Sequence, residues 1–221
     1  MLDQDKSLID GFITISDKEL ENGIKYNPDT ESLDPEQVRG AMVIGKTRRL
    51  RLDWRKICPK DYDNTDVSKI PPKKMKAVIS GFESAGGLFI SGKAGTFKSR
   101  CAWYLLAREF IGGSSIDCLN WYSMPELMWM EAGERRERVS KASECDLLLI
   151  DDFMKTKCTE AIEATLFAIL ERRCSSCLPF IITSNVKLDE IARFFTDNGG
   201  EIRAEAIQRR IRENSFVMES K

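Results

Sequence analysis

A glycine-rich segment, Gly92-Lys-Ala-Gly-Thr-Phe-Lys-Ser99, carries the residue types that bind phosphate. The backbone N–H groups of such a turn, together with the N-terminus of the helix that follows, would surround a phosphate group. Lys98 would reach the β- and γ-phosphates of a nucleotide, and the Ser99 hydroxyl would ligate Mg²⁺. Gly95 and Thr96 form the flexible middle of the loop. The spacing therefore predicts a P-loop that binds a nucleoside triphosphate with Mg²⁺.

One position of this segment departs from the usual P-loop. The residue before the lysine is Phe97, where a glycine is usual. A bulky side chain there would either be forced toward positive φ, at a strain of about 1–3 kcal/mol, or reshape the loop. The segment alone leaves two interpretations open: a working P-loop, which we favour, and a strand-turn-helix in which glycine and lysine occur by chance.

A pair of carboxylates follows an apolar run at Leu147-Leu-Leu-Ile-Asp-Asp152. Such a Walker B strand would deliver its acids to the carboxyl edge of a parallel sheet, where ligands of open α/β sheets bind. Asp151 would hold Mg²⁺ through water, and Asp152 would orient and deprotonate the attacking water. The alternative is a solvated acidic turn after a core strand, and the P-loop upstream weakens that alternative.

Polar residues further along the chain could complete such a site. The run Phe180-Ile-Ile ends in Thr183-Ser-Asn185. In P-loop ATPases with an additional strand, a polar residue at this point helps to position water near the γ-phosphate; Asn185 fits that role, although Asn after a strand is also a common turn former. The segment Ile207-Gln-Arg-Arg-Ile-Arg-Glu213 places several guanidinium groups on one helix. They could stabilise a phosphoryl group at a neighbouring subunit or form a solvated basic face.

These motifs lie in a pattern of alternating strands and helices. From Gly86 onward, short apolar segments alternate with helical ones, which is typical of a three-layer α/β fold with a parallel sheet. An amphipathic helix that begins at Pro71 and Pro72 precedes them, and Ser123 with Glu126 predicts a capping box. We expect strands at residues 87–91, 115–121, 146–151, 179–183 and 216–218, and helices at residues 98–110, 159–173, 187–195 and 201–213.

Composition narrows the classes of protein. Of the 221 residues, 42% are hydrophobic and 31% are charged, which indicates a globular chain. The absence of histidine excludes Ser-His pairs and His-ligated metal sites. Seven cysteines without framework spacing, with Cys174 and Cys177 as a single CxxC pair, fit reduced, structural thiols. No apolar run approaches the roughly 20 residues of a membrane helix, and the polar N-terminus is unlike a signal peptide, so we expect a cytoplasmic protein.

The order of these elements and motifs resembles AAA+ ATPases of the bacterial helicase-loader type, which include DnaC-like and DnaI-like loaders and IstB-like transposition helpers. The similarity covers roughly residues 70–218. It is carried by Gly92-Lys-Ala-Gly-Thr-Phe-Lys-Ser99, Leu147-Leu-Leu-Ile-Asp-Asp152, Glu171-Arg-Arg173, Ile181-Ile-Thr-Ser-Asn185 and Ala206-Ile-Gln-Arg-Arg-Ile-Arg-Glu213.

The resemblance implies a fold, cofactors and a site. The fold would be an AAA+ P-loop NTPase with a parallel sheet in the order 5-1-4-3-2, binding ATP and Mg²⁺. Arg210 aligns with the arginine finger that such proteins place in a neighbouring subunit. Two departures stand against a full transfer: Phe97 replaces the loop glycine, and the chain ends at Lys221, where relatives place another arginine, so we expect a truncated helical lid. The residues that bind the nucleotide and act on it would be Lys98, Ser99, Asp151, Asp152 and Asn185.

The same resemblance implies a function. Residues 71–221 would form the ATPase core and residues 1–70 a small partner-binding region. The chain would act in DNA replication or transposition, as a helicase loader or transposition helper, with a replicative helicase or transposase as partner. Single-stranded DNA would be a further ligand, and homo-oligomers would depend on nucleotide. Two other classes stay open: a degenerate P-loop scaffold without hydrolysis, and a small-metabolite P-loop kinase, which would lack the extra strand that ends in a polar residue.

Aromatic and basic residues between the second and third expected strands could contact DNA. A net charge of −1 requires any nucleic-acid contact to come from a local patch. Trp121, Tyr122, Trp129 and the charged run at residues 134–138 could stack on bases and follow phosphates. Trp at helical spacing is more often core, and mixed Glu and Arg usually form a solvated face. We favour that structural interpretation.

The N-terminal part carries weaker signals. A helical patch is expected near residues 35–42, and a basic run follows at residues 46–56. The run could bind nucleic acid or an acidic partner. Because Leu50, Leu52 and Trp54 alternate along it, a half-exposed β-strand is an equal alternative.

Overall fold

A computed structural model of the chain describes residues 49–63, 67–155, 158–195 and 200–220. The chain divides into two units, Met1–Val67 and Ser68–Lys221. The helical patch expected near residues 35–42 lies outside the described residues, as do the first three residues of the basic run. All of the predicted site residues belong to the second unit.

In the first unit, the described part of the basic run is helical from residue 49 to residue 57, so the strand interpretation is wrong. The helical period places Arg51 and Trp54 on one buried face, whereas Leu52 is 48% exposed. The Arg51 guanidinium pairs with the carboxylate of Asp63 at 2.7 Å, at the end of α4 (Lys60–Asp63). At least one arginine of the basic run is therefore structural.

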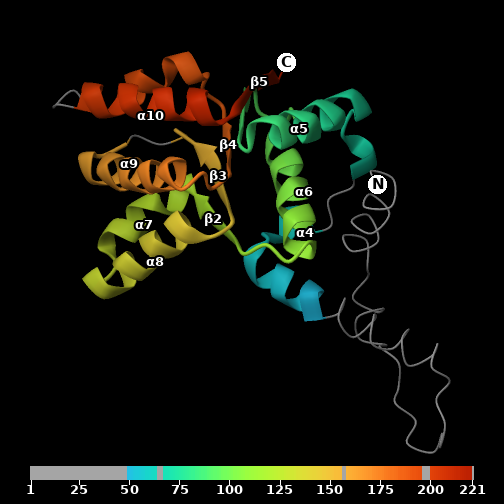
Figure 1. Cartoon of the computed structure of the whole chain (residues 1–221), viewed down its shortest axis with the longest axis horizontal. Helices are drawn as coiled ribbons and strands as arrows, with labels where there is room; N and C mark the ends of the chain where they lie inside the picture. The colour runs from blue at the N-terminus through green and yellow to red at the C-terminus, as the bar shows by residue number, and fades with distance from the viewer. Residues whose placement is uncertain (1–48, 64–66, 156–157, 196–199, 221) are drawn as a thin grey trace, which may run out of the picture. The chain divides into compact units, whose positions relative to one another are not determined.

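The second unit contains a five-stranded parallel sheet in the order β2-β3-β4-β1-β5 (Figure 1). This is the predicted order 5-1-4-3-2 viewed from the other edge, so the predicted fold is confirmed. Strands that are buried on both faces are near-continuous apolar runs, which explains the sequences of β1, β3 and β4. The strands are β1 (Leu88–Gly92), β2 (Ile116–Asn120), β3 (Leu147–Phe153), β4 (Phe180–Ser184) and β5 (Phe216–Ser220).

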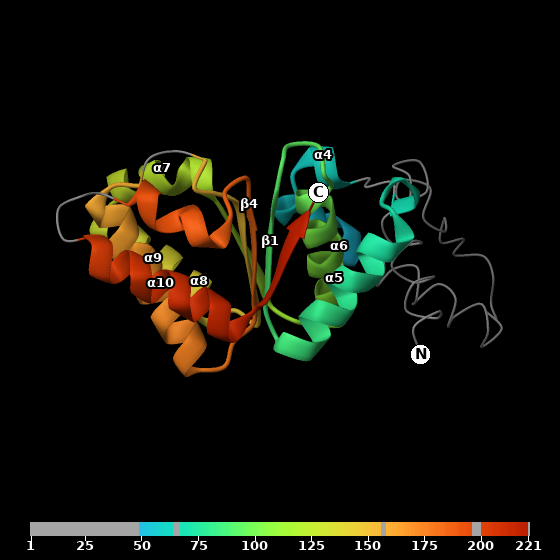
Figure 2. The ribbon, with the colours of Figure 1, turned by 90° about the horizontal axis from the view of Figure 1, so that it is seen from above.

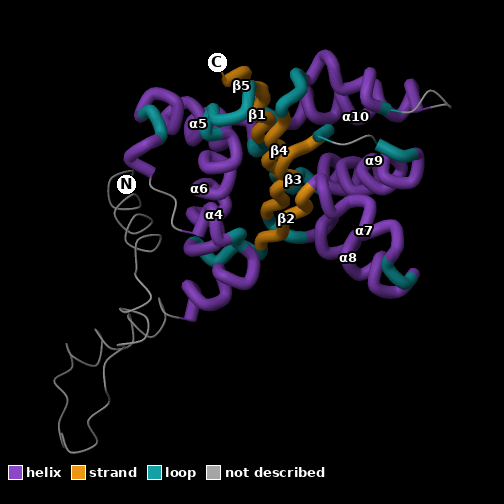
Figure 3. The backbone as a smooth tube through the Cα atoms, turned by 180° about the vertical axis from the view of Figure 1, so that it is seen from behind, coloured by secondary structure: helices purple, strands orange, loops and turns teal. Residues whose placement is uncertain are grey.

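Helices cover both faces of this sheet and give three layers (Figure 2, Figure 3). α5 and α6 lie on one face, and α7 to α10 lie on the other. The helical segments are η1 (Val67–Lys69), α5 (Pro72–Ala85), α6 (Lys98–Ile111), η2 (Trp121–Ser123), α7 (Met124–Trp129), α8 (Ala132–Glu144), α9 (Glu160–Ser175), η3 (Leu188–Phe194) and α10 (Gly200–Asn214).

Local sequence explains both ends of α5 and the start of α9. α5 begins at Pro72 and is followed by Gly86, whose φ of 67° suits glycine. The Thr159 side chain caps α9 by accepting a hydrogen bond from a backbone N–H of the first turn. The predicted capping box at Ser123 is wrong. A 3₁₀ turn precedes α7, so Ser123 donates to the Asn120 carbonyl oxygen, and the Asn120 side chain caps that turn.

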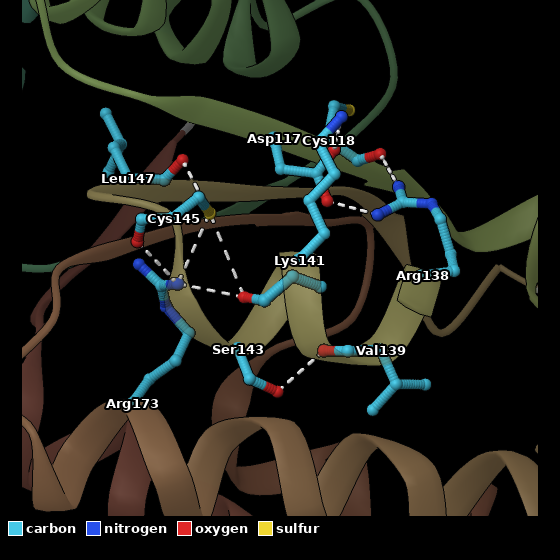
Figure 4. A network of polar contacts seen from close by, with 10 residues as sticks. Asp117, Cys118, Arg138, Val139, Lys141, Ser143, Cys145, Leu147 and Arg173 are labelled. Atoms are coloured by element: carbon cyan, nitrogen blue, oxygen red, sulfur yellow. Dashed lines mark hydrogen bonds and ion pairs between the residues drawn. The ribbon is translucent and has the colours of Figure 1, made fainter. Parts of the chain in front are cut away.

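A buried arginine joins the amino ends of two strands to the end of a helix (Figure 4). Arg173, on α9, is fully buried, and burial lowers the pKa of its guanidinium. It donates to the carbonyl oxygens of Ala142 at 2.8 Å and Cys145 at 2.9 Å, where α8 gives way to β3. It also donates to the Pro179 carbonyl oxygen at 2.5 Å, just before β4. This arginine of the Glu171-Arg-Arg173 motif therefore holds the fold together.

Candidate functional site

The carboxyl ends of three neighbouring strands bring the predicted phosphate and carboxylate residues together. β1 ends at Gly92, β3 carries Asp151 and Asp152, and β4 ends at Ser184. A Cβ atom at Gly92 would come within 2.2 Å of the Ser220 carbonyl oxygen on β5, so only glycine fits there. The loop after Gly92 leads from a buried strand into the N-terminus of a helix, as a P-loop must.

The loop accommodates Phe97 in the left-handed region. Its φ of 63° and ψ of 15° match the first of the two alternatives that the sequence left open, a positive φ rather than a reshaped loop. Gly95 also has a positive φ, of 80°. A residue with a Cβ atom is strained in this region, yet α6 still begins at Lys98, directly after Phe97. The phenylalanine therefore does not displace the helix N-terminus from the loop.

Lys98 lies over its own loop. Its ammonium group donates to the Lys93 carbonyl oxygen at 2.8 Å. Burial lowers the pKa of Lys98, whereas the nearby carboxylates of Asp152 and Asp151 raise it. The Walker B carboxylates therefore favour the charged form of Lys98, which is the form that binds phosphate.

Three side chains from three elements form one hydrogen-bonded group, the Ser99–Asp151–Thr183 cluster. Ser99 Oγ, in the first turn of α6, donates to Asp151 Oδ1 at 2.8 Å. Thr183 Oγ1, on β4, donates to the same carboxylate oxygen at 2.5 Å. Asp151 is only 3% exposed. A hydroxyl and a carboxylate are hard oxygen donors of the kind that Mg²⁺ prefers, so the residues of this cluster fit a magnesium ion.

Thr183 is a site residue that the sequence analysis missed. Besides its bond to Asp151, its hydroxyl oxygen accepts a hydrogen bond from the Asp152 backbone N–H at 3.1 Å. The sequence signal for Thr183 is the polar end of the strand, Thr183-Ser-Asn185, from which the sequence analysis assigns the water-positioning role to Asn185. Asn185 is exposed and lies just beyond the last residue of β4. A shift in strand register between Ile150 and Phe153 accompanies the approach of β3 to β4 at this point.

Asp152 is held differently from its neighbour. Its φ is 58°, so the strand turns sharply at the second carboxylate. Its carboxylate pairs with Lys155 at 3.1 Å, and its side chain is 25% exposed. A partly exposed carboxylate at the sheet edge could accept a proton from water.

Arg210 lies against the neighbouring helix of its own chain. Its guanidinium pairs with the Glu171 carboxylate on α9 and lies over the Phe167 ring, 4.7 Å from the ring centre. Its side chain is only 16% exposed. Arg209, next to it, is exposed. Arg210 contacts α9 and its own helix α10, and within the described residues it does not contact the P-loop of its own chain.

The aromatic residues near α7 divide into two groups. Trp121 is fully buried and packs edge-on against Phe153, so the core interpretation is right for this residue. Trp129 is 88% exposed and Tyr122 is 47% exposed, so that interpretation is wrong for Trp129. In the charged run of α8, Arg138 pairs with Asp117, while most of the run is exposed as expected.

A hollow of about 440 Å³ lies at the amino edge of the sheet, where Asp146 and Pro179 precede β3 and β4. Among the described residues, no group of three or more Cys, Asp or Glu side chains could hold a metal ion. Within the same residues, no helix is long and apolar enough to cross a bilayer.

The similarity of this chain to known proteins is found in its structure. No protein-family model and no curated protein sequence matches the chain. The structure superposes on DnaI with a TM-score of 0.61 at 18% identity, over 74% of this chain and 92% of DnaI. The chain has the AAA+ fold.

Two structures of the replication initiator DnaA share this AAA+ fold. One is DnaA bound to AMPPCP and single-stranded DNA, with a TM-score of 0.58 at 18% identity over 74% of this chain and 50% of that one. The other is domain III of DnaA from Thermotoga maritima, with a TM-score of 0.52 at 19% identity over 69% of this chain and 64% of that one. The present chain thus spans about half of the first DnaA chain.

Proposed function

We propose that this AAA+ protein binds ATP with Mg²⁺ and hydrolyses it when a neighbouring subunit completes the site. The Ser99–Asp151–Thr183 cluster carries the proposal, because it links the P-loop helix, the Walker B strand and the strand between them through hydrogen bonds. The AMPPCP in one structurally similar DnaA is consistent with a nucleotide at this edge.

The residues of the site would divide the work. Gly92, Gly95, Thr96 and Phe97 would form the loop around the phosphates, and Lys98 would exchange the Lys93 carbonyl for a phosphate oxygen. Ser99 and Asp151 would hold Mg²⁺, which neutralises charge on the phosphates when it is bound. Asp152 would accept a proton from the attacking water, and Asn185 would help to orient that water.

Arg210 would complete the site of a neighbouring subunit in a nucleotide-dependent homo-oligomer. To reach that site, it must exchange its pair with Glu171 for the phosphate of the neighbour. Arg210→Ala should then abolish the rise of the hydrolysis rate per subunit with protein concentration. The adjacent, exposed Arg209 provides the matched control. If Arg209→Ala removes the dependence and Arg210→Ala does not, the assignment is wrong.

The proposed biological role is that of a cytoplasmic helicase loader or transposition helper. DnaI and DnaA, the structural neighbours, support a role in replication, and the partner would be a replicative helicase or a transposase. Residues 1–70 would bind that partner. Trp129 and Tyr122 are exposed and could stack on the bases of single-stranded DNA. Trp129→Ala should weaken binding to an oligonucleotide, while Met130→Ala should not.

Two observations favour the scaffold alternative, in which ATP is not hydrolysed. Phe97 strains the loop because its φ is positive, and the Lys98 ammonium group donates a hydrogen bond to a carbonyl oxygen of the same loop. A large gain of nucleotide affinity in Phe97→Gly would point to a loop that has lost its function. The kinase alternative has less support, since β4 lies between β1 and β3.

The deciding experiment is a titration with a fluorescent ATP analogue and Mg²⁺. The proposal expects saturable binding that is lost in Lys98→Ala. Lys93→Ala is the matched control, because Lys93 is an exposed lysine of the same loop and contributes only its carbonyl oxygen to the contact with Lys98. Absence of binding at millimolar nucleotide, or equal losses in both variants, would contradict the proposal.

A further inference from the structure

A lysine outside the P-loop motif contacts the loop. Lys74 lies on α5, and its ammonium group donates hydrogen bonds to the Thr96 carbonyl oxygen and to the Ser220 hydroxyl. The Ser220 hydroxyl in turn lies 3.4 Å from the same carbonyl oxygen. Three segments that are far apart in sequence therefore meet at one peptide group, the one that joins Thr96 to Phe97.

The position of that peptide in the loop explains what the contact with Lys74 can do. It directly precedes the residue that sits in the left-handed region with a φ of 63°. A carbonyl oxygen held on one side fixes the orientation of its peptide plane, and this orientation limits the φ of the next residue. A side chain that holds the Thr96 carbonyl thus opposes relaxation of Phe97 out of its strained conformation.

Lys74 is also held in an unusual environment for a lysine. Burial lowers the pKa of its ammonium group, and its charge acts on Lys98, whose pKa it lowers. A second cation close to the phosphate-binding lysine costs electrostatic free energy, and charge-assisted hydrogen bonds to the loop and to β5 offset that cost.

We propose that Lys74, with Ser220, is a positioning residue that clamps the Thr96–Phe97 peptide and keeps the loop in its phosphate-binding shape despite the missing glycine. The consequence for nucleotide affinity rests on the proposed function. The clamp itself is a property of the free protein. Lys74 acts through the loop backbone and not by touching the nucleotide.

The test combines two substitutions in one cycle. Lys74→Met should weaken binding of the fluorescent ATP analogue about tenfold in the natural background, as expected for loss of a charge-assisted hydrogen bond. In the Phe97→Gly background, where the loop needs no clamp, the same substitution should cost about twofold or less. Lys74→Arg should retain most of the affinity. Equal losses in the two backgrounds would overturn the proposal, since they would indicate general destabilisation.

A second readout works without nucleotide. Amide hydrogen exchange of the segment from Gly95 to Lys98 should become faster in Lys74→Met and, to a smaller degree, in the milder variant Ser220→Ala. Lys76→Met, on an exposed position of the same helix, provides the control and should leave exchange unchanged. If the natural protein binds no nucleotide, the proposed function fails while this exchange measurement still decides the clamp. Unchanged exchange in Lys74→Met would overturn it.

Discussion

The two edges of the sheet hold their charged groups in different ways. At the amino edge, Arg173 donates to main-chain carbonyl oxygens at the end of α8 and before β4. At the carboxyl edge, Asp151 accepts from the side-chain hydroxyls of Ser99 and Thr183. A main-chain acceptor cannot turn away without local unfolding, whereas a hydroxyl can rotate to a new partner. The amino edge therefore suits stability, and the carboxyl edge suits an exchange of ligands.

The largest effect on stability is expected at the amino edge. Arg173→Met should lower the free energy of unfolding by about 3 kcal/mol, because several buried carbonyl oxygens lose their donor. Urea denaturation measures this as a lower midpoint. The control is Arg172→Met, because the Arg172 side chain is 60% exposed and its guanidinium pairs with Glu144; the cost should be within about 0.5 kcal/mol. Equal costs for the two variants would remove the contrast between the edges.

The matching substitution at the carboxyl edge should separate affinity from stability. In Asp151→Asn, the hydroxyls of Ser99 and Thr183 can rotate to suit an amide, so the free energy of unfolding should change by about 1 kcal/mol or less. The Mg²⁺-dependent affinity for nucleotide should fall at least about tenfold, because a carboxylate ligand is lost. Asp146→Asn at the amino edge is the control and should leave that affinity unchanged. A loss of stability as large as that of Arg173→Met would show that Asp151 is structural.

A smaller effect is expected at Thr183. Thr183→Val removes the hydroxyl at constant shape and should cost about 1 kcal/mol of unfolding free energy. It should also reduce nucleotide affinity by about threefold, since Asp151 loses one of the donors that orient it. Thr183→Ser keeps the hydroxyl and should restore both quantities. Failure of the serine variant to restore affinity would indicate that the methyl group matters instead.

The pH dependence of nucleotide affinity tests the role of Lys98 at the carboxyl edge. Burial, Lys74 and Lys155 lower the pKa of Lys98 in the free protein, while Asp152 and Asp151 raise it. A bound triphosphate favours the ammonium form, so binding takes up a proton at alkaline pH. Affinity should therefore fall as pH rises through the lowered pKa, by at most about tenfold per pH unit.

Lys98→Arg provides the comparison for that titration, because its guanidinium stays charged at any accessible pH. Its affinity should change less between about pH 7 and pH 10. Identical profiles for the two proteins would assign the pH dependence to another group.

The resemblance to AAA+ ATPases implied the order of the strands in the sheet, which the structure confirms. Sequence patterns predicted the alternation of strands and helices and the approach of the P-loop to the Walker B carboxylates. They did so because strand and loop signals are local: Gly92, Lys98 and Asp151 stand in short segments with clear spacing. The same local argument offered the positive φ of Phe97 as one of two alternatives, and the structure has that one.

Long-range contacts could not be predicted in this way. The hydroxyl of Thr183 reaches Asp151 only because of the register between β3 and β4, and the two residues are 32 positions apart. Lys74 and Ser220 are 146 positions apart. A single sequence does not indicate which residues so far apart along the chain lie close together in the fold.

Short ambiguous patterns produced the wrong predictions. Around Trp54 the apolar residues fit both a period of two and a helical turn, and burial of Arg51 decided for the helix. At Ser123, the capping residue types were present, but in the 3₁₀ turn before α7 the Ser123 hydroxyl donates to the Asn120 carbonyl oxygen instead.

The exposure of Trp129 gives the protein an optical label of its own. The chain has four tryptophans, and Trp54, Trp103 and Trp121 are at most 2% exposed, whereas Trp129 is 88% exposed. In the native state, a soluble quencher should act mainly on the indole at the end of α7, and Trp129→Phe should leave an emission spectrum dominated by sheltered indoles. Fluorescence of the unlabelled chain can therefore report on this corner of the molecule when a nucleic acid or another protein arrives.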